Sequence, residues 1–220
     1  TDARVKELEY IFNRFPNSPL LSVKLQEYVR NREEVVYNFE DWAARDFHDP
    51  VWVKYKYVRD SIDEPVFYNE LKRFANNVVR AKQCRQKGMW YYALAYLHHL
   101  NGKRESAIAL LSKAEQSEAT PFIKESIKAF RFLTDAAYAN NSSEYRSRLL
   151  QYIKWLDGMM QQDIGLYADD NWQYENKMNW SFYYWQDVVR KVLLGDVCPK
   201  IEKSGNTTLA LQLANYASNR

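Results

Sequence analysis

Residues 88–121 read GMWYYALAYLHHLNGKRESAIALLSKAEQSEATP and give the clearest indication of the architecture. Two stretches rich in alanine and leucine, at 88–101 and 104–117, are separated by a short polar segment that contains Gly102. Strong helix formers fill both stretches, and a glycine between them is typical of a tight turn. Two helices with so short a connection pack as antiparallel neighbours. The segment therefore predicts a helical hairpin.

Small and large apolar residues recur at fixed positions along this hairpin. The positions are Tyr91, Leu94, Ala95, Gly102, Ala107, Leu111 and Ala114, followed by Pro121. Their spacing resembles the tetratricopeptide repeat (TPR), a pair of antiparallel helices that stacks on its neighbours to form a solenoid. The resemblance implies that the leucines fill the space between the helices, that the alanines let the backbones approach, and that Gly102 allows the turn. His98 departs from the pattern, because a large apolar or aromatic residue is usual there.

A second stretch, residues 194–217, carries the same spacing. Its matching residues are Leu194, Val197, Cys198, Ile201, Gly205, Ala210, Ala214 and Ala217. Gly205 lies 103 positions after Gly102, close to three repeats of about 34 residues each. Pro199 falls inside the first helix of this stretch. It is expected to kink that helix, because proline lacks the amide hydrogen and clashes with the preceding turn.

The rest of the chain is also predicted to be helical. The 220 residues include only 6 Gly and 6 Pro, and the β-branched residues Val, Ile and Thr number 28. Four of the prolines stand where a first helical residue would, a position that needs no amide hydrogen: Pro19, Pro50, Pro65 and Pro121. The expected helices are 3–14, 19–30, 33–47, 50–60, 65–86, 88–101, 104–117, 121–139, 143–161, 181–203 and 207–218. We therefore expect an all-α fold, a single TPR-like α–α superhelix of about five irregular helix pairs over residues 1–220.

Charge and cysteine content narrow the choice of partners. Lys and Arg number 31 against 28 Asp and Glu, and the longest basic stretch, residues 80–87, is expected to spread around the end of the helix at 65–86. This pattern weighs against a nucleic-acid partner. No apolar run reaches the roughly 18 residues that a membrane-spanning helix needs. Cys84 and Cys198 lack the spacing of a metal site, and they are either two buried thiols or one disulfide.

Motifs for catalysis or cofactor binding are missing from the sequence. With 6 glycines in the chain, a glycine-rich loop that cradles phosphate is almost excluded. Adjacent His98 and His99 would point about 100° apart on a helix, so they would not chelate one ion. The carboxylate pairs at 33–34 and 63–64 stand at expected helix starts, where negative charge offsets the helix dipole. We therefore predict no metal and no cofactor.

The segment 167–185 holds eight aromatic residues among 19, interleaved with carboxylates and amides. We place it in an insertion at residues 164–185. Flat rings beside polar groups suit a peptide or a sugar face, whereas rings that close an irregular end of the core are the structural alternative. The candidate ligand-binding residues are Tyr167, Asp169, Asp170, Trp172, Tyr174, Trp180 and Tyr184.

Three functions follow from these observations. The preferred one is a non-catalytic module that binds or scaffolds a protein or peptide, as the TPR resemblance implies. The second is a carbohydrate-binding protein of the cell envelope, and the third is a helical-toroid enzyme that processes glycosides, with Asp169 or Asp170 as catalytic acid. The junction at 15–19, FPNSP, resembles those of bacterial envelope proteins with helical repeats, which favours the periplasm or cell surface. The chain starts at Thr1 and ends directly after an apolar helical pattern, so we expect a piece of a longer protein that self-associates through cut solenoid ends.

Overall fold

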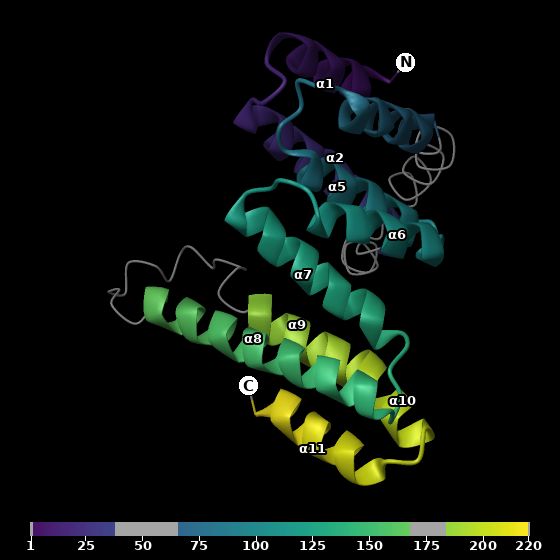
Figure 1. Cartoon of the computed structure of the whole chain (residues 1–220), viewed down its shortest axis with the longest axis vertical. Coiled ribbons are helices and arrows are strands. Elements are labelled where there is room, and N and C mark those ends of the chain that lie inside the picture. The colour runs from purple at the N-terminus through teal and green to yellow at the C-terminus, as the bar shows by residue number, and fades with distance from the viewer. Residues whose placement is uncertain (1, 38–65, 168–183, 220) are drawn as a thin grey trace, which may run out of the picture. The chain divides into compact units, whose positions relative to one another are not determined.

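All secondary structure in the described part of the chain is helical (Figure 1). The computed structural model describes residues 2–37, 66–167 and 184–219. An unlabelled helix covers residues 66–80. The labelled elements are α1 (Ala3–Arg14), α2 (Pro19–Tyr37), α5 (Lys87–Leu100), α6 (Arg104–Glu115), α7 (Pro121–Ala136), α8 (Ser143–Tyr167), α9 (Tyr184–Val192), the π-helix η3 (Leu193–Val197), α10 (Cys198–Lys203) and α11 (Thr207–Ser218).

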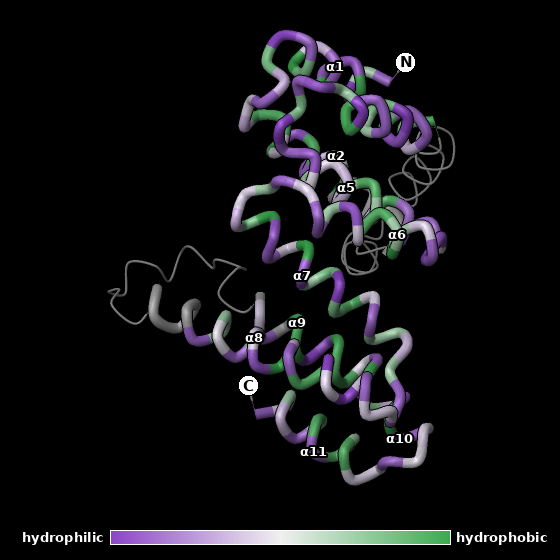
Figure 2. The backbone as a smooth tube through the Cα atoms, viewed as in Figure 1, coloured by the Kyte–Doolittle hydropathy of each residue, from purple (hydrophilic) through white to green (hydrophobic). Residues whose placement is uncertain are grey.

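The chain divides into two compact units, Thr1–Lys128 and Ala129–Arg220, with the boundary inside α7. In both units hydrophobic and hydrophilic residues alternate along the helices instead of forming long runs (Figure 2). An amphipathic helix of this kind buries one face and leaves the other in water. Each unit has its own cluster of buried hydrophobic residues, one within residues 5–97 and the other within residues 129–217.

The core of the first unit is built from α1, α2, the helix at 66–80 and α5. Asp2 caps α1 by accepting a hydrogen bond from the amide of Arg4, at 2.9 Å. The rings of Phe12, Phe74 and Trp90 form successive edge-to-face contacts, with centroids 6.0 Å and 5.5 Å apart. Such contacts stabilise a core beyond the area that the rings bury.

Helices α5 and α6 form the hairpin expected from residues 88–117. Gly102 has a φ of 68°, and its amide donates to the carbonyl of His99, while the amide of Lys103 donates to the carbonyl of His98. This left-handed glycine with a pair of backward hydrogen bonds is a Schellman turn. Six of the residues matched to the TPR pattern lie on the two helices of this hairpin. Tyr91 is partly buried, and the other five are buried: Leu94, Ala95, Ala107, Leu111 and Ala114.

The second unit contains α8, α9, η3, α10 and α11, with α9 in contact with both α8 and α11 (Figure 1). The turn from α10 to α11 repeats the geometry of the turn after α5. Gly205 has a φ of 91°, its amide donates to the carbonyl of Glu202, and the amide of Asn206 donates to the carbonyl of Ile201. Ala210 and Ala217 are buried in this hairpin, as Ala107 and Ala114 are in the first.

Proline at position 199 is accommodated without ending the helical path. The five residues Leu193–Val197 form a π-helical turn directly before α10, and the amide of Cys198 reaches back to the carbonyl of Leu193. Pro199 then stands in the first turn of α10, where a missing amide hydrogen is tolerated. The disturbance expected in this helix therefore takes the form of a π turn.

Two helix boundaries of the first unit differ from the predictions, and in the second unit α8 continues to Tyr167, six residues beyond the end predicted at 161 and into the predicted insertion at 164–185. The predicted break at 31–32 is wrong, because α2 continues from Pro19 to Tyr37. The predicted helix at 65–86 ends at residue 80, so the basic stretch 80–87 lies mostly in a turn instead of around a helix. Asn17 holds this turn, since its side chain donates to the carbonyl of Gln83 and accepts from the amide of Arg85, at 3.0 Å and 2.9 Å. The predicted helix at 50–60 and most of the one at 33–47 lie outside the described residues.

Candidate binding surface

The aromatic segment singled out in the sequence lies mostly outside the described residues. This holds for Asp169, Asp170, Trp172, Tyr174 and Trp180, while Tyr167 ends α8 and Tyr184 begins α9. The next residue, Trp185, is 9% exposed, and its ring meets that of Trp155 edge-to-face with centroids 5.1 Å apart. Trp185 therefore belongs to the core of the second unit, and it fixes the start of α9 against α8.

A row of rings on α5 forms a second aromatic feature. Tyr92, Tyr96 and His99 follow one another at intervals of four and three residues, which places them on one face of the helix. The centroids of Tyr92 and Tyr96 are 6.4 Å apart, and those of Tyr96 and His99 are 6.2 Å apart in a stacked arrangement. All three side chains are half-buried. We call these three residues the α5 aromatic row.

Positive charge lies close to the end of this row. Burial lowers the pKa of His99, and the neighbouring charge of Arg104 lowers it further. Burial also lowers the pKa of His98, with Lys72 and Lys103 acting in the same direction. Both imidazoles are therefore neutral at pH 7, and the fixed charge here comes from lysine and arginine. A ligand bound along the row would contact the rings of Tyr92 and Tyr96 and would have cations near it at the His99 end of the row.

The sequence contained a signal for the α5 aromatic row, namely rings at helical spacing between 92 and 99. The row itself was not predicted, because His99 was weighed only together with His98 as a metal ligand and rejected in that role. Among the described residues, no group of three or more His, Cys, Asp and Glu side chains is placed to hold a metal ion. Cys84 and Cys198 are both buried free thiols, and burial raises the pKa of each.

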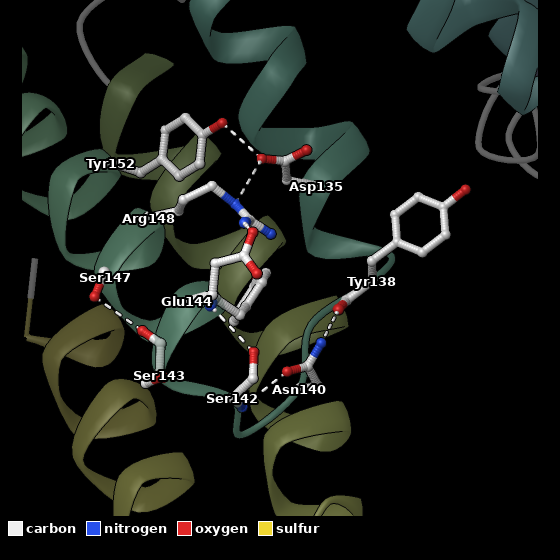
Figure 3. A network of polar contacts seen from close by, with 10 residues as sticks. Asp135, Tyr138, Asn140, Ser142, Ser143, Glu144, Ser147, Arg148 and Tyr152 are labelled. Atoms are coloured by element: carbon white, nitrogen blue, oxygen red, sulfur yellow. Dashed lines mark hydrogen bonds and ion pairs between the residues drawn. The ribbon is translucent and has the colours of Figure 1, made fainter.

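A polar network joins the end of α7 to the start of α8 in the second unit (Figure 3). The hydroxyl of Tyr152 donates to Asp135 at 2.8 Å, and the guanidinium of Arg148 lies 3.7 Å from the same carboxylate and 2.6 Å from that of Glu144. Ser142 caps α8 by accepting from the amide of Tyr145. Each charge in this network faces its opposite, so the arrangement suits a structural joint between two helices.

The same joint reaches the turn before α11. The side chain of Asn206 accepts from the amide of Leu209, which caps α11, and donates to the side chain of Asn141 at 2.8 Å. One asparagine thus caps a helix and also ties together two turns that are 65 residues apart. These contacts position α11, whose exposed residues include the apolar Leu211 but are otherwise mostly polar.

Comparison with known proteins provides no relative. No protein-family model matches the chain, and no curated protein and no solved structure matches it either. None of the described helices has the length and apolar character needed to cross a membrane.

Proposed function

We propose that this chain is a non-catalytic binding module of TPR-like helix pairs, which holds a peptide segment of a partner protein on the α5 aromatic row. The observation that carries the ligand is the row itself, with two stacked or tilted ring pairs on one face of α5 and cations at its end.

The architecture is supported by position-by-position similarity between the two hairpins. A shift of 103 residues carries Gly102 onto Gly205, and both glycines have positive φ and the same two backward hydrogen bonds. The same shift carries several buried residues of the first hairpin onto buried residues of the second. The pairs are Trp90 and Leu193, Leu94 and Val197, Ala95 and Cys198, Ala107 and Ala210, and Ala114 and Ala217. Repeated units of one architecture predict this correspondence.

The chemistry of the row favours a peptide that carries carboxylates. Tyrosine supplies rigid contact area at low entropic cost, which makes it a frequent anchor in binding surfaces. Lys72 and Lys103 lie close enough to His98, beside the row, for their charges to act on it, and cations beside the row favour a ligand that carries negative charge. We therefore expect ligands in which an apolar or aromatic residue is followed by Asp, Glu or a free carboxyl terminus.

Selection from a displayed peptide library on the immobilised chain tests this proposal. The affinity of an enriched peptide is then measured by calorimetry for the wild type, for Tyr96→Ala and for His99→Ala. Loss of a central aromatic contact costs about 2 kcal/mol, so we expect affinity to fall about 30-fold. Tyr138→Ala is the matched control, because this tyrosine is 51% exposed and its ring points away from the network in Figure 3. Enriched peptides that bind Tyr96→Ala and His99→Ala as tightly as wild type would contradict the proposal, and melting curves identify any variant that has lost its fold.

A carbohydrate is the second candidate ligand, since sugar rings pack on the flat faces of aromatic side chains and the row contains the stacked rings of Tyr96 and His99. An oligosaccharide array probed with the same variants distinguishes it from a peptide. The enzymatic alternative rests on Asp169 and Asp170, which lie outside the described residues, and it stays a prediction.

A further inference from the structure

Two segments of the first unit carry cations and no carboxylates. Residues 71–104 contain eight Lys and Arg and no Asp or Glu, and residues 10–26 contain two cations and again no acid. The net charge of the whole chain is only +3, because most other segments carry acidic residues. The net positive charge is therefore concentrated in these two segments. Clustering of this kind marks a surface that meets negative charge.

The structure brings these two segments together at their turns. Asn17, in the turn between α1 and α2, makes two hydrogen bonds with the turn at 81–86, to Gln83 and to Arg85. Arg14, Lys82 and Arg85 are exposed around this junction. Among the described residues neither Lys82 nor Arg85 forms an ion pair, and Arg14 lies over the ring of Tyr10 at 4.5 Å. The charge at the junction is therefore left to solvent.

Large apolar side chains are exposed at the same place. Phe15, in the turn, is 63% exposed, and Leu20 and Val23 on the outer face of α2 are 47% and 58% exposed. Single exposed apolar residues are normal on a protein surface. Here three of them fall in the nine-residue stretch 15–23, so they form a cluster. We call Arg14, Phe15, Leu20, Val23, Lys82 and Arg85 the basic turn surface.

We propose that the basic turn surface docks reversibly on an anionic lipid membrane, with Phe15 and its apolar neighbours entering the headgroup region and the cations facing lipid phosphates. Apolar residues beside lysine and arginine are the combination that an anionic interface accommodates. The residues sit on turns and on an outer helix face, which suits a flat surface better than a peptide that needs a groove. A nucleic acid would engage the cations but would gain little from Leu20 and Val23.

Carboxylates near the surface limit the attraction without cancelling it. Glu7 and Glu27 already pair with Lys24, at 3.5 Å and 3.3 Å. Glu118 is exposed in the turn whose backbone accepts a hydrogen bond from the amide of Gly88. Arg80 is also exposed, next to the turn at 81–86. The exposed cations near the surface therefore outnumber the exposed carboxylate of Glu118.

Co-sedimentation with lipid vesicles tests the proposal. Vesicles of phosphatidylcholine with about 30% phosphatidylglycerol are compared with phosphatidylcholine alone, because each basic residue near an anionic surface contributes about five-fold in affinity. We expect binding only to the anionic vesicles and weaker binding as salt rises. The variant K82Q/R85Q should lose about 25-fold in affinity, and F15S/V23S should lose about ten-fold or more.

Matched controls separate this surface from general charge and hydrophobicity. K154Q/R190Q removes two exposed cations of the second unit, and L150S/L211S removes two apolar side chains of the same unit that are 52% and 66% exposed. Both controls should bind like the wild type. Absence of binding to anionic vesicles would overturn the proposal, and so would equal losses in the control variants. A loss in K82Q/R85Q with none in F15S/V23S would also overturn it, since the contact would then be with any polyanion.

Discussion

Alanine at position 88 should destabilise the first unit, because the start of α5 lies directly against the turn after α6. A Cβ at Gly88 would be 2.8 Å from the Cβ of Ala119, 3.0 Å from the carbonyl oxygen of Glu118 and 3.3 Å from that of Ala114. Carbon atoms pack at no less than about 3.5 Å, so the turn would have to move by about 0.7 Å. The atoms in the way are backbone and a methyl group, which have no rotamer to change.

Two contributions lower the free energy of unfolding of Gly88→Ala, and one raises it. Forced movement of a packed backbone costs about 1–3 kcal/mol. The hydrogen bond from the amide of Gly88 to Glu118, 3.0 Å long, contributes about 1 kcal/mol and would weaken. Alanine is the better helix former by up to about 1 kcal/mol, which offsets part of the loss. We therefore expect Gly88→Ala to lower the free energy of unfolding by about 1–3 kcal/mol.

Urea unfolding followed by circular dichroism measures this change. Gly158→Ala is the matched control, because a Cβ there meets no atom within 4 Å and Gly158 lies inside α8. The control should be as stable as the wild type or more stable by up to about 1 kcal/mol. If Gly88→Ala were equally neutral, α5 would not approach the turn after α6 as described, and the packing of the first hairpin would be refuted.

Three further predictions concern the second unit. Trp185→Ala should lower the free energy of unfolding by about 3–5 kcal/mol, because it empties a buried site against Trp155; an unchanged urea midpoint would place this ring outside the core. Burial, together with the charge of Asp135, raises the pKa of Tyr145 above its ordinary 10.0, so the folded state keeps a proton that the unfolded chain releases. Stability should therefore fall above about pH 10 by roughly 1.4 kcal/mol per pH unit from this group, and Tyr145→Phe should make the measured slope shallower by that amount; equal slopes would contradict the burial of its hydroxyl. Asn206→Ala should cost more than Asn141→Ala, by about 1 kcal/mol, since only Asn206 also caps α11; thermal melts of the two variants that coincide would show that the cap contributes nothing.

The ends of several helices were predictable because their signals are local. The predicted helices 3–14 and 207–218 coincide with α1 and α11, where Asp2 and Asn206 cap the first turn with their own side chains. Gly102 and Gly205 likewise mark turns that need a positive φ, a conformation that glycine adopts at little cost. A cap or a left-handed glycine acts on its immediate neighbours, so its effect can be inferred from sequence alone.

The turn at 81–86 was not predictable in this way. No glycine or proline stops the helix at residue 80, and the contacts that hold the turn come from Asn17, which lies 66 and 68 positions away from its two partners. The break predicted at 31–32 failed for the opposite reason, because a polar run without glycine or proline does not by itself end a helix. Contacts between distant segments therefore decided where the exposed cations lie.

The α5 aromatic row depends on a different kind of information. Its spacing was present in the sequence, but Tyr91, Tyr92, Tyr96, His98 and His99 are all aromatic or imidazole side chains on one short helix. The helical spacing places Tyr92, Tyr96 and His99 on one face of α5, whereas Tyr91 packs against the core and has the Lys113 ammonium over its ring, 6.0 Å from the centroid. Side-chain directions on a helix were thus needed to tell a candidate binding row from packing residues.

The most direct test of the proposed binding site is chemical-shift mapping with an isotopically labelled chain and a peptide from the library selection. We expect the largest shifts on titration at the amides of Tyr92, Tyr96 and His99 and at the imidazole of His99. Shifts confined to other helices, with the α5 resonances unmoved at saturation, would contradict the proposed site.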